Sequence, residues 1–410
     1  MSEYVIIGNG TAAVACVEGI RSVDKEGGIT VVSAEKYAAY CRPLISYYLG
    51  GKTDEKRMQY RAESFYADNK CEVKYGQNAV KLDGAAKTVT LESGETLKYD
   101  KLCVATGSSP FVPPMEGLDK VEHKYGFLTM DDAKALKAVA DPEKEVLIIG
   151  AGLIGLKCME GLYNSVKHIT VVDLADRVLS SILDADGAAL VQKKIEEKGV
   201  DFLLSDSVAR FEGNTAVMKS GKTVTFDLLV TAVGVRANMG LVKEAGGVCG
   251  RAIAVDDEMK TSIPDVYAAG DCTEYVDITD GQQKIMALMP NAYMQGFGAG
   301  VNMAGGQHRF DNAIPMNAIG FFGYHIMTAG SKDGLICSEV TEQGLKKLYG
   351  TKERLTGFEI VGDVKRTGIY TSLIRNKTDI STLQPEQLEK VPDLYIFEPE
   401  TRKKMLGGVV

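Results

Sequence analysis

A short glycine-rich pattern that occurs twice constrains the fold of this chain more than any other feature of its sequence. In each copy an apolar run enters a glycine turn, and a second apolar run follows and ends near an acid, Glu35 or Asp173. The two turns are Gly8-Asn9-Gly10-Thr11-Ala12-Ala13 and Gly150-Ala151-Gly152-Leu153-Ile154-Gly155. This strand–turn–helix–strand context separates a dinucleotide-binding motif from a chance match to its glycines.

The residue types in the motif fit the chemistry of a dinucleotide. The first glycine permits a tight turn, and the second lets the backbone approach a pyrophosphate. A small third residue, Ala13 or Gly155, allows the helix to pack closely on its strand. The helix offers free N–H groups and the positive end of its dipole to phosphates, and the later acid accepts hydrogen bonds from ribose hydroxyls. Two complete copies therefore predict two dinucleotide sites.

Each copy also has a later apolar strand that ends in small residues, Ala105-Thr106-Gly107 in the first and Ala232-Val233-Gly234 in the second. Continuous apolar runs are typical of buried parallel strands, and their small-residue ends leave room for a ligand. Beyond about Pro315, hydrophobic alternation in residues 334–337 and 355–362 indicates further sheet.

We therefore expect an α/β protein with two Rossmann-like dinucleotide-binding domains and a smaller C-terminal α+β domain. The second dinucleotide-binding domain is expected to be inserted in the first. The expected boundaries are 1–115 and 240–312 for the first domain, 116–239 for the second and 313–410 for the C-terminal domain.

Composition excludes several classes of protein. The net charge of -8 and a sequence pI of about 5.3 argue against nucleic-acid binding. No apolar run reaches the roughly 18–20 residues that span a bilayer, and the N-terminus lacks the regions of a signal peptide, so we expect a cytoplasmic protein without a membrane partner. The eight cysteines form no CxxC pair, and the four histidines lack metal-ligand spacing, so no metal site is expected.

Five motifs in a fixed order, GxGxxA, ATG, GxGxxG, AVG and AAGD, resemble the FAD-dependent pyridine nucleotide oxidoreductases, which have the glutathione-reductase-like fold. The resemblance covers about residues 1–310. Three segments are most similar to the branch that contains NADH:rubredoxin oxidoreductase and the FAD domain of nitrite reductase. They are residues 40–46, with an Arg-Pro pair, residues 315–318 and residues 358–363.

The resemblance implies that the first copy binds FAD and the second binds NADH. Glu35 would bond the FAD ribose, Asp271 the ribityl chain and Asp173 the NADH ribose, which favours NADH over NADPH. The full set that it implies for FAD is Gly8, Gly10, Thr11, Ala12, Glu35, Arg42, Val80, Thr106, Gly107, Asp271 and Ala292. The set for the second site is Gly152, Leu153, Ile154 and Asp173, and Gly234 is a further cofactor-binding candidate.

The chain departs from the family pattern at three points. It lacks the CxxxxC pair of the disulfide reductases, so reduction of a disulfide by a dithiol is not expected. Lys157 stands where the family usually has a glutamate, and Tyr47 stands where related reductases often have a base. One hypothesis is that Lys157 reaches the nicotinamide carboxamide or the flavin edge. The alternative is an ordinary solvated lysine on a helix.

Three functions follow from the resemblance. The first is electron transfer from NADH through FAD to a partner such as rubredoxin, ferredoxin or another iron–sulfur protein. The second is an NADH oxidase, peroxidase or thiol reductase in which Cys41 is the redox thiol. The third is a flavoprotein of apoptosis-inducing-factor type, in which NADH binding sets an interaction surface. A homodimer is compatible with each.

Overall fold

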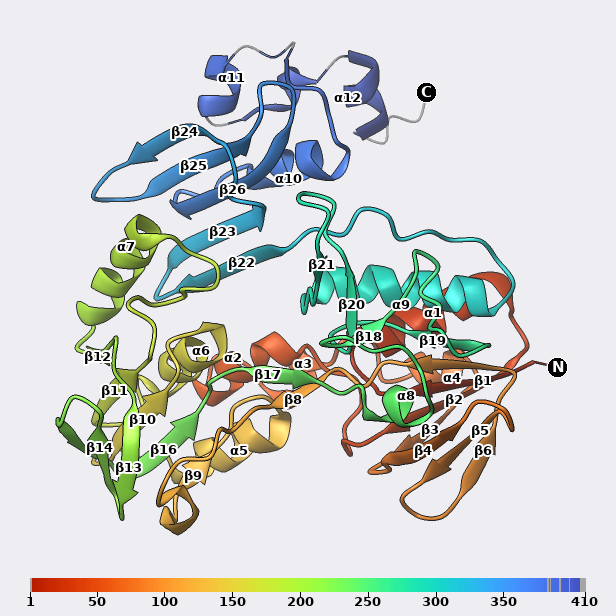
Figure 1. The fold of residues 1–410 in the computed structure, drawn as a ribbon, viewed down its shortest axis with the longest axis horizontal. Helices are drawn as coiled ribbons and strands as arrows, with labels where there is room; N and C mark the ends of the chain where they lie inside the picture. The colour runs from red at the N-terminus through yellow and green to blue at the C-terminus, as the bar shows by residue number, and fades with distance from the viewer. Residues whose placement is uncertain (1, 382, 384, 391, 398, 406–410) are drawn as a thin grey trace. The chain divides into compact units, whose positions relative to one another are not determined.

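The computed structural model describes residues 2–381, 383, 385–390, 392–397 and 399–405 (Figure 1). Contacts within the chain divide it into two compact units. Unit 1 comprises Met1–Asp176, Gly199–Val276 and Gln283–Ala313, and unit 2 comprises Arg177–Lys198, Asp277–Gln282 and Ile314–Val410. This division is based on contacts and not on the sequence repeat. The boundaries of the three domains expected from the sequence therefore stay a prediction.

Unit 1 contains two parallel sheets with the same strand arrangement, as the repeated motif predicts. In each sheet the strand before the glycine turn is central, and its neighbours are the strand before the acid and the later small-residue strand. The first sheet has the order β19 (Val266–Ala268), β7 (Lys101–Val104), β1 (Glu3–Ile7), β2 (Gly28–Ser33) and β3 (Cys71–Tyr75). The second has the order β12 (Asp201–Leu203), β11 (His168–Val172), β10 (Glu145–Ile149), β16 (Leu228–Thr231) and β9 (Lys124–Tyr125).

A three-stranded antiparallel sheet precedes the small-residue strand in both halves of the repeat. These sheets are β4 (Ala79–Asp83), β5 (Thr88–Leu91) and β6 (Thr96–Lys98), and β13 (Val208–Glu212), β14 (Thr215–Met218) and β15 (Thr223–Thr225). The two segments that join the halves pair with each other as β8 (Ser108–Pro110) and β17 (Val235–Ala237). Three short strands, β18 (Ile253–Ala254), β20 (Thr273–Val276) and β21 (Gln283–Lys284), complete the strands of the unit.

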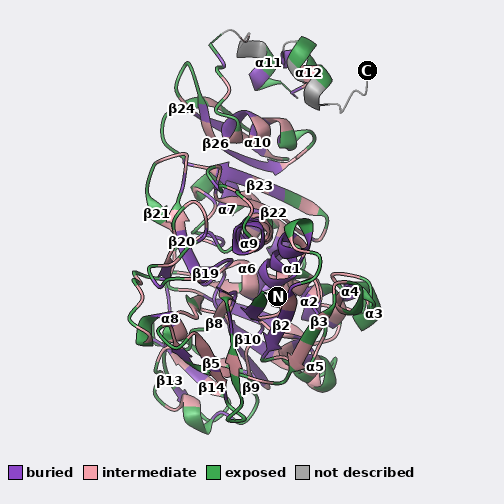
Figure 2. Cartoon of the chain, turned by 90° about the vertical axis from the view of Figure 1, so that its right-hand side faces the viewer, coloured by how far each residue is buried: buried purple, intermediate pink, exposed green. Residues whose placement is uncertain are grey.

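The helices of unit 1 follow the pattern expected of the repeat, with a helix opening directly after each glycine turn. These two are α1 (Thr11–Val23) and α6 (Leu153–Leu162). The others are η1 (Arg42–Leu44), α2 (Ile45–Leu49), α3 (Glu55–Met58), α4 (Phe65–Asp68), η2 (Leu118–Lys120), α5 (Met130–Val139), α8 (Gly240–Glu244) and α9 (Met289–Met303). The central strands of both sheets are buried, whereas the short helix α3 is largely exposed (Figure 2).

Unit 2 is built on a five-stranded antiparallel sheet, which confirms the sheet expected beyond Pro315. Its order is β22 (Met316–Phe321), β23 (Tyr324–Gly330), β26 (Leu355–Gly362), β25 (Leu345–Gly350) and β24 (Leu335–Val340). Its helices are α7 (Ala185–Glu196), α10 (Thr367–Arg375), α11 (Pro385–Glu389), η3 (Leu394–Ile396) and α12 (Pro399–Met405). None of the helices among the described residues is long and apolar enough to cross a membrane.

Charged side chains attach α7 to this sheet. Lys347 on β25 pairs with Asp184, the N-cap of α7, at 2.5 Å and with Asp186 at 2.6 Å. Glu359 on β26 has a fully buried side chain, which pairs with Lys332 and accepts a 3.2 Å hydrogen bond from the backbone N–H of Asp184. Helix α7 follows the second dinucleotide motif in the sequence, but it is part of unit 2.

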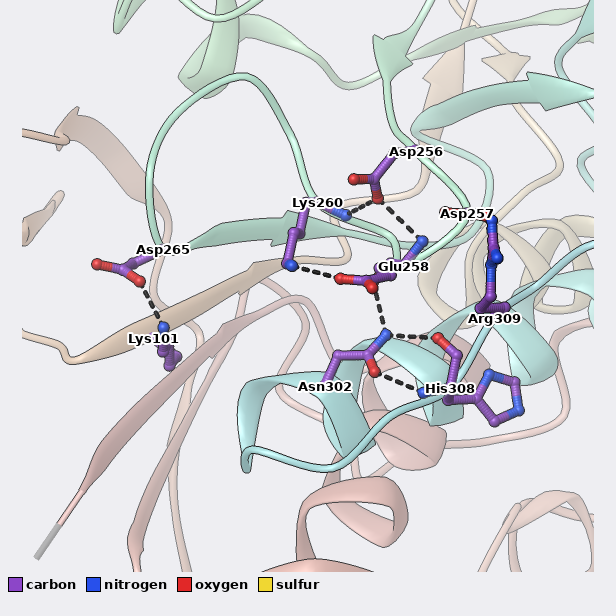
Figure 3. Close-up of polar contacts among 9 residues, drawn as sticks. All are labelled: Lys101, Asp256, Asp257, Glu258, Lys260, Asp265, Asn302, His308 and Arg309. Atoms are coloured by element: carbon purple, nitrogen blue, oxygen red, sulfur yellow. Dashed lines mark hydrogen bonds and ion pairs between the residues drawn. The ribbon is translucent and has the colours of Figure 1, made fainter.

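Two helices of unit 1, α1 and α9, pack at close range because glycines line their contact. A Cβ atom built on Gly300 would lie 2.2 Å from the carbonyl oxygen of Cys16, and one on Gly296 would lie 2.1 Å from that of Ala12. Polar bonds fix the far end of α9, as Figure 3 shows. Asn302 donates to the carbonyl oxygens of Glu258 and His308, at 2.9 and 2.8 Å, and accepts from the backbone N–H of His308. The glycine contacts hold α9 against the helix that follows the first glycine turn, and the Asn302 bonds hold the end of α9 against the segments that carry Glu258 and His308.

Substituting Gly300 tests this contact. Gly300→Ala is expected to destabilise the protein by about 1–3 kcal/mol, since the methyl group overlaps the backbone of α1. The measurement is the denaturant midpoint by circular dichroism. Gly368→Ala is the matched control, because a Cβ on Gly368 in α10 meets nothing within 4 Å. Equal midpoints for the two variants would contradict the packing described for α1 and α9.

Candidate dinucleotide-binding sites

The first glycine turn leaves the N-terminus of α1 open. Gly8 has φ +113°, and a Cβ there would lie 2.0 Å from the carbonyl oxygen of Ala105, so only glycine fits. Gly10 is the N-cap of α1, and no side chain caps the helix and no acid lies in its first turn. A Cβ on Gly10 would meet nothing within 4 Å. The open helix end, with Thr11 and Ala12 as its first residues, fits a pyrophosphate group.

The second glycine turn repeats this geometry. Gly150 also has φ +113°, and its Cβ would lie 2.3 Å from the carbonyl oxygen of Ala232. Gly152 is the N-cap of α6, again without a side-chain cap or an acid in the first turn, and a Cβ there meets nothing. Leu153 and Ile154 are the first residues of α6 and are partly exposed. The second helix end fits a pyrophosphate in the same way.

Asp271 follows strand β19 and lies next to the starts of helices α1 and α9. The preceding Gly270 has φ +85°, and a Cβ there would lie 3.1 Å from the Cβ of Ala12 and 3.5 Å from that of Ala292. The backbone N–H of Gly270 donates to Gln295 at 2.8 Å. Burial raises the pKa of the Asp271 carboxyl, and the charge of Arg42 opposes that rise. A partly buried acid beside the first residues of α1 fits the hydroxyl donors of a polyol such as the ribityl chain of FAD.

Glu35 bonds to two neighbouring side chains of unit 1. Arg42 pairs with one carboxylate oxygen at 2.5 Å, and the Tyr40 hydroxyl donates to the other at 2.7 Å. Arg42 also donates to the carbonyl oxygen of Leu128 at 2.9 Å, and Tyr40 accepts from the N–H of Met130 at 3.0 Å. Glu35 and Arg42 are thus brought together, and the network connects the first half of the repeat to α5.

Asp173 contacts the glycine turn of its own half. Its carboxylate accepts hydrogen bonds from the backbone N–H groups of Ala151 at 2.6 Å and Ala175 at 2.8 Å. The acid expected to bond a ribose therefore also fixes the turn in which the pyrophosphate is expected to lie.

The ends of the small-residue strands are connected through a residue that the motifs did not reveal. Thr106 donates to the carbonyl oxygen of Asn238 at 2.7 Å, and the Asn238 amide donates back to that of Thr106 at 2.9 Å. Gly107 and Gly234 both have positive φ, and a Cβ on either would meet nothing within 4 Å. Asn238, like Gln295, lies outside the five sequence motifs.

Three predicted residues lie apart from these clusters. Val80 is on β4 and is 49% exposed. Cys41 is half-buried ahead of η1, and burial raises the pKa of its thiol. Lys157 pairs with Glu160 at 2.7 Å on α6, a partner that its i,i+3 spacing could have indicated. The placement of these residues leaves their roles as predictions.

The comparisons with known proteins also indicate a protein with dinucleotide-binding sites. The family model described as "Pyridine nucleotide-disulphide oxidoreductase" matches residues 2–296. The putidaredoxin reductase of a covalent complex with putidaredoxin has the same fold, with a TM-score of 0.87, 22% identity and coverage of 99% of this chain and 98% of that one. Two open glycine turns on two parallel sheets, with this match, define an NAD(P)H-dependent flavin oxidoreductase, a class that binds FAD and NAD(P)H.

The chain belongs to the pyridine nucleotide-disulphide oxidoreductase family. It is 30% identical over 396 residues to the NADH-dependent phenylglyoxylate dehydrogenase subunit epsilon of Aromatoleum evansii, covering 93% of this chain and 94% of that one. It is 31% identical over 297 residues to a rubredoxin–NAD(+) reductase of Pseudomonas putida, covering 71% and 77%. It is 31% identical over 391 residues to the nitrite reductase of Bacillus subtilis, covering 92% of this chain but only 48% of that relative.

Removing the Asp271 carboxylate tests the first site. Asp271→Ala is expected to weaken FAD retention by about 1–3 kcal/mol, because the hydrogen bond that the carboxylate accepts from a ribityl hydroxyl is lost. The FAD content per chain after gel filtration is the measurement. Asp119→Ala is the control, since Asp119 is exposed on η2. Full FAD occupancy in the Asp271 variant would contradict the assignment.

Proposed function

We propose that this chain binds FAD at the first glycine turn and NADH at the second, and passes electrons to an iron–sulfur or rubredoxin-type protein. The observation that carries the proposal is the pair of open helix ends, at Gly10 and Gly152, within one unit. Bound FAD would accept a hydride equivalent from a reduced nicotinamide and release electrons singly. The chain's own part is to bind and orient the two cofactors.

The residues that would hold FAD are those gathered around the open end of α1. Gly8 and Gly10 let the pyrophosphate approach the helix, Asp271 accepts from the ribityl chain, and Glu35 accepts from the ribose beside Arg42. In the second half, Gly152 would take the NADH pyrophosphate.

The proposed preference for NADH rests on Asp173. Its carboxylate accepts from the backbone N–H groups of Ala151 and Ala175 and so places an acidic group beside the turn. A 2′-phosphate on the ribose would be repelled by that carboxylate.

Two observations support a protein acceptor over a thiol. A rubredoxin–NAD(+) reductase and a subunit of an NADH-dependent dehydrogenase are among the relatives of this chain. Cys41 is the thiol of the alternative function, and burial raises the pKa of that thiol, which disfavours the thiolate that a redox cysteine needs. Rubredoxin or ferredoxin is therefore the acceptor class that we propose.

An anaerobic acceptor screen tests the function. The FAD-loaded protein should be bleached rapidly by NADH and more slowly by NADPH, as judged by stopped-flow absorbance. The reduced protein should then be reoxidised by rubredoxin or ferredoxin faster than by oxygen, peroxide or a disulfide. Equal kcat/KM values for the two coenzymes would count against the interpretation of Asp173, and fastest reoxidation by peroxide or a disulfide would count against the protein acceptor.

Cys41→Ser separates the two mechanisms. The variant should keep most of its NADH-to-acceptor activity, because no step of the proposed function requires a thiol. Cys71→Ser is a matched control, since Cys71 on β3 is also partly buried and burial raises its pKa to about 11. A loss of more than about a hundredfold, roughly 2.7 kcal/mol of barrier, in the Cys41 variant alone would favour the thiol mechanism.

A further inference from the structure

The chain passes between the two halves of the repeat in both directions, and the two crossings pair with each other. The outward crossing, β8, follows Gly107 at the end of the first small-residue strand, and the return crossing, β17, follows Gly234 at the end of the second. They form an antiparallel ribbon in which Ser108 lies opposite Ala237 (Figure 1). The backbone that joins the two parallel sheets therefore passes through this ribbon both ways.

Asn238 closes one end of the ribbon with four hydrogen bonds. Its backbone N–H donates to the carbonyl oxygen of Gly107 at 2.9 Å, and its backbone carbonyl accepts from the Thr106 hydroxyl at 2.7 Å. Its side-chain amide donates to the carbonyl oxygen of Thr106 at 2.9 Å and accepts from the Ser109 hydroxyl at 2.8 Å. An asparagine side chain can bond in both directions because it carries a donor and an acceptor. We call these four bonds the Asn238 clamp.

The other end of the ribbon is held by different contacts. The backbone N–H of Phe111 donates to the carbonyl oxygen of Gly234 at 2.9 Å, and the Arg236 guanidinium lies 4.5 Å from the centre of the Phe111 ring. The ring is 37% exposed, and cation–π contacts at exposed sites are weak. Gly234 has φ +116°, and a Cβ there would meet nothing within 4 Å. The side-chain bonds of Asn238 thus make its own end the more firmly held one.

The clamp is attached to residues that we propose for the FAD site. Thr106 and Gly107, which are in that set, take part in three of the four bonds. Asn238 itself lies on the segment that returns from the second sheet. The clamp therefore joins the returning strand directly to the end of the first sheet. Hydride transfer requires reacting atoms about 3–3.5 Å apart, so a small shift in how the second half is held would change its rate.

We propose that Asn238 is a positioning residue for hydride transfer, which acts through the ribbon by holding the second half of the repeat in register with the first. This inference rests on the proposed function, because it requires FAD in the first half and NADH in the second. Asn238 contacts neither cofactor in this proposal. Its loss is therefore expected to slow the transfer step and to leave the binding of each cofactor in place.

Two substitutions remove the side-chain bonds and keep the backbone ones. Asn238→Leu removes both at similar volume, and Asn238→Asp keeps the acceptor for Ser109 but turns a carboxylate oxygen toward the Thr106 carbonyl. Flavin bleaching at saturating NADH, followed by anaerobic stopped flow, should slow about tenfold or more. FAD content should be unchanged, and the Kd for NAD+ by calorimetry should stay within about twofold. Asn376→Asp is the matched control, because Asn376 is exposed and its amide donates only to Ser372, at 3.1 Å.

A disulfide across the ribbon should rescue the Asn238→Leu variant. Ser108 and Ala237 face each other next to the hydrogen-bonded pair of Gly107 and Asn238, so theirs is a pair without backbone bonds, where side chains come closest. Ser108→Cys with Ala237→Cys, oxidised by glutathione disulfide, should restore most of the bleaching rate. Reduction of the new disulfide and removal of the reductant should abolish the gain. The unaltered protein, treated in the same way, controls for its native thiols.

The outcomes separate the clamp from the function on which it rests. An unaltered FAD-loaded protein that NADH does not bleach would overturn the proposed function. Bleaching of Asn238→Leu within about twofold of the unaltered rate, with both cofactors bound, would overturn the clamp alone. A variant that binds NAD+ more weakly but reaches the unaltered rate at saturation would also overturn it. If Asn238→Leu loses FAD, the isosteric Asn238→Asp decides by the same criteria. A slower transfer that the disulfide restores would support the inference.

Discussion

The close approach of two backbone segments at Gly8 determines much of unit 1. The carbonyl oxygen of Ala105 occupies the place where any side chain of residue 8 would begin, so β1 and β7 can lie side by side only with glycine at the turn. The same constraint recurs at Gly150 and Ala232. Because each turn is fixed in this way, the following helix starts at a defined point, and its N–H groups face open space. The two candidate cofactor sites therefore depend on how these strands pack.

Acidic residues around these turns bond first to the protein itself. Glu35 accepts from Arg42 and Tyr40, and Asp173 accepts from backbone N–H groups in and after its turn. A carboxylate has room for further donors, so such bonds would orient each acid for the ribose that we propose it binds. Preorganisation of this kind reduces the entropy that binding has to overcome.

Most of the architecture could be predicted from the sequence, because the glycine motif specifies the strand, turn and helix around it. Glycine spacing, apolar runs and the position of each acid indicated two equivalent parallel sheets, and the alternation beyond Pro315 indicated the antiparallel one. Partners that depend on tertiary contacts were not predictable. Gln295 and Asn238 are polar residues outside the motifs, and their bonds connect residues that are 25 and 132 positions apart in the chain. The association of α7 with the C-terminal sheet was missed for the same reason, since Lys347 and Glu359 look like ordinary strand residues.

That last contact affects how pieces of such proteins can be exchanged. A chimera that took its C-terminal segment from a relative and was joined at residue 313 would keep Asp184 and Asp186 but replace Lys347, Lys332 and Glu359. The recipient helix would then meet a foreign sheet with unmatched charges, and burying one partner of such a pair without the other costs about 3–5 kcal/mol. For recombination, the natural module is the sheet together with α7, although more than a hundred residues of sequence separate them.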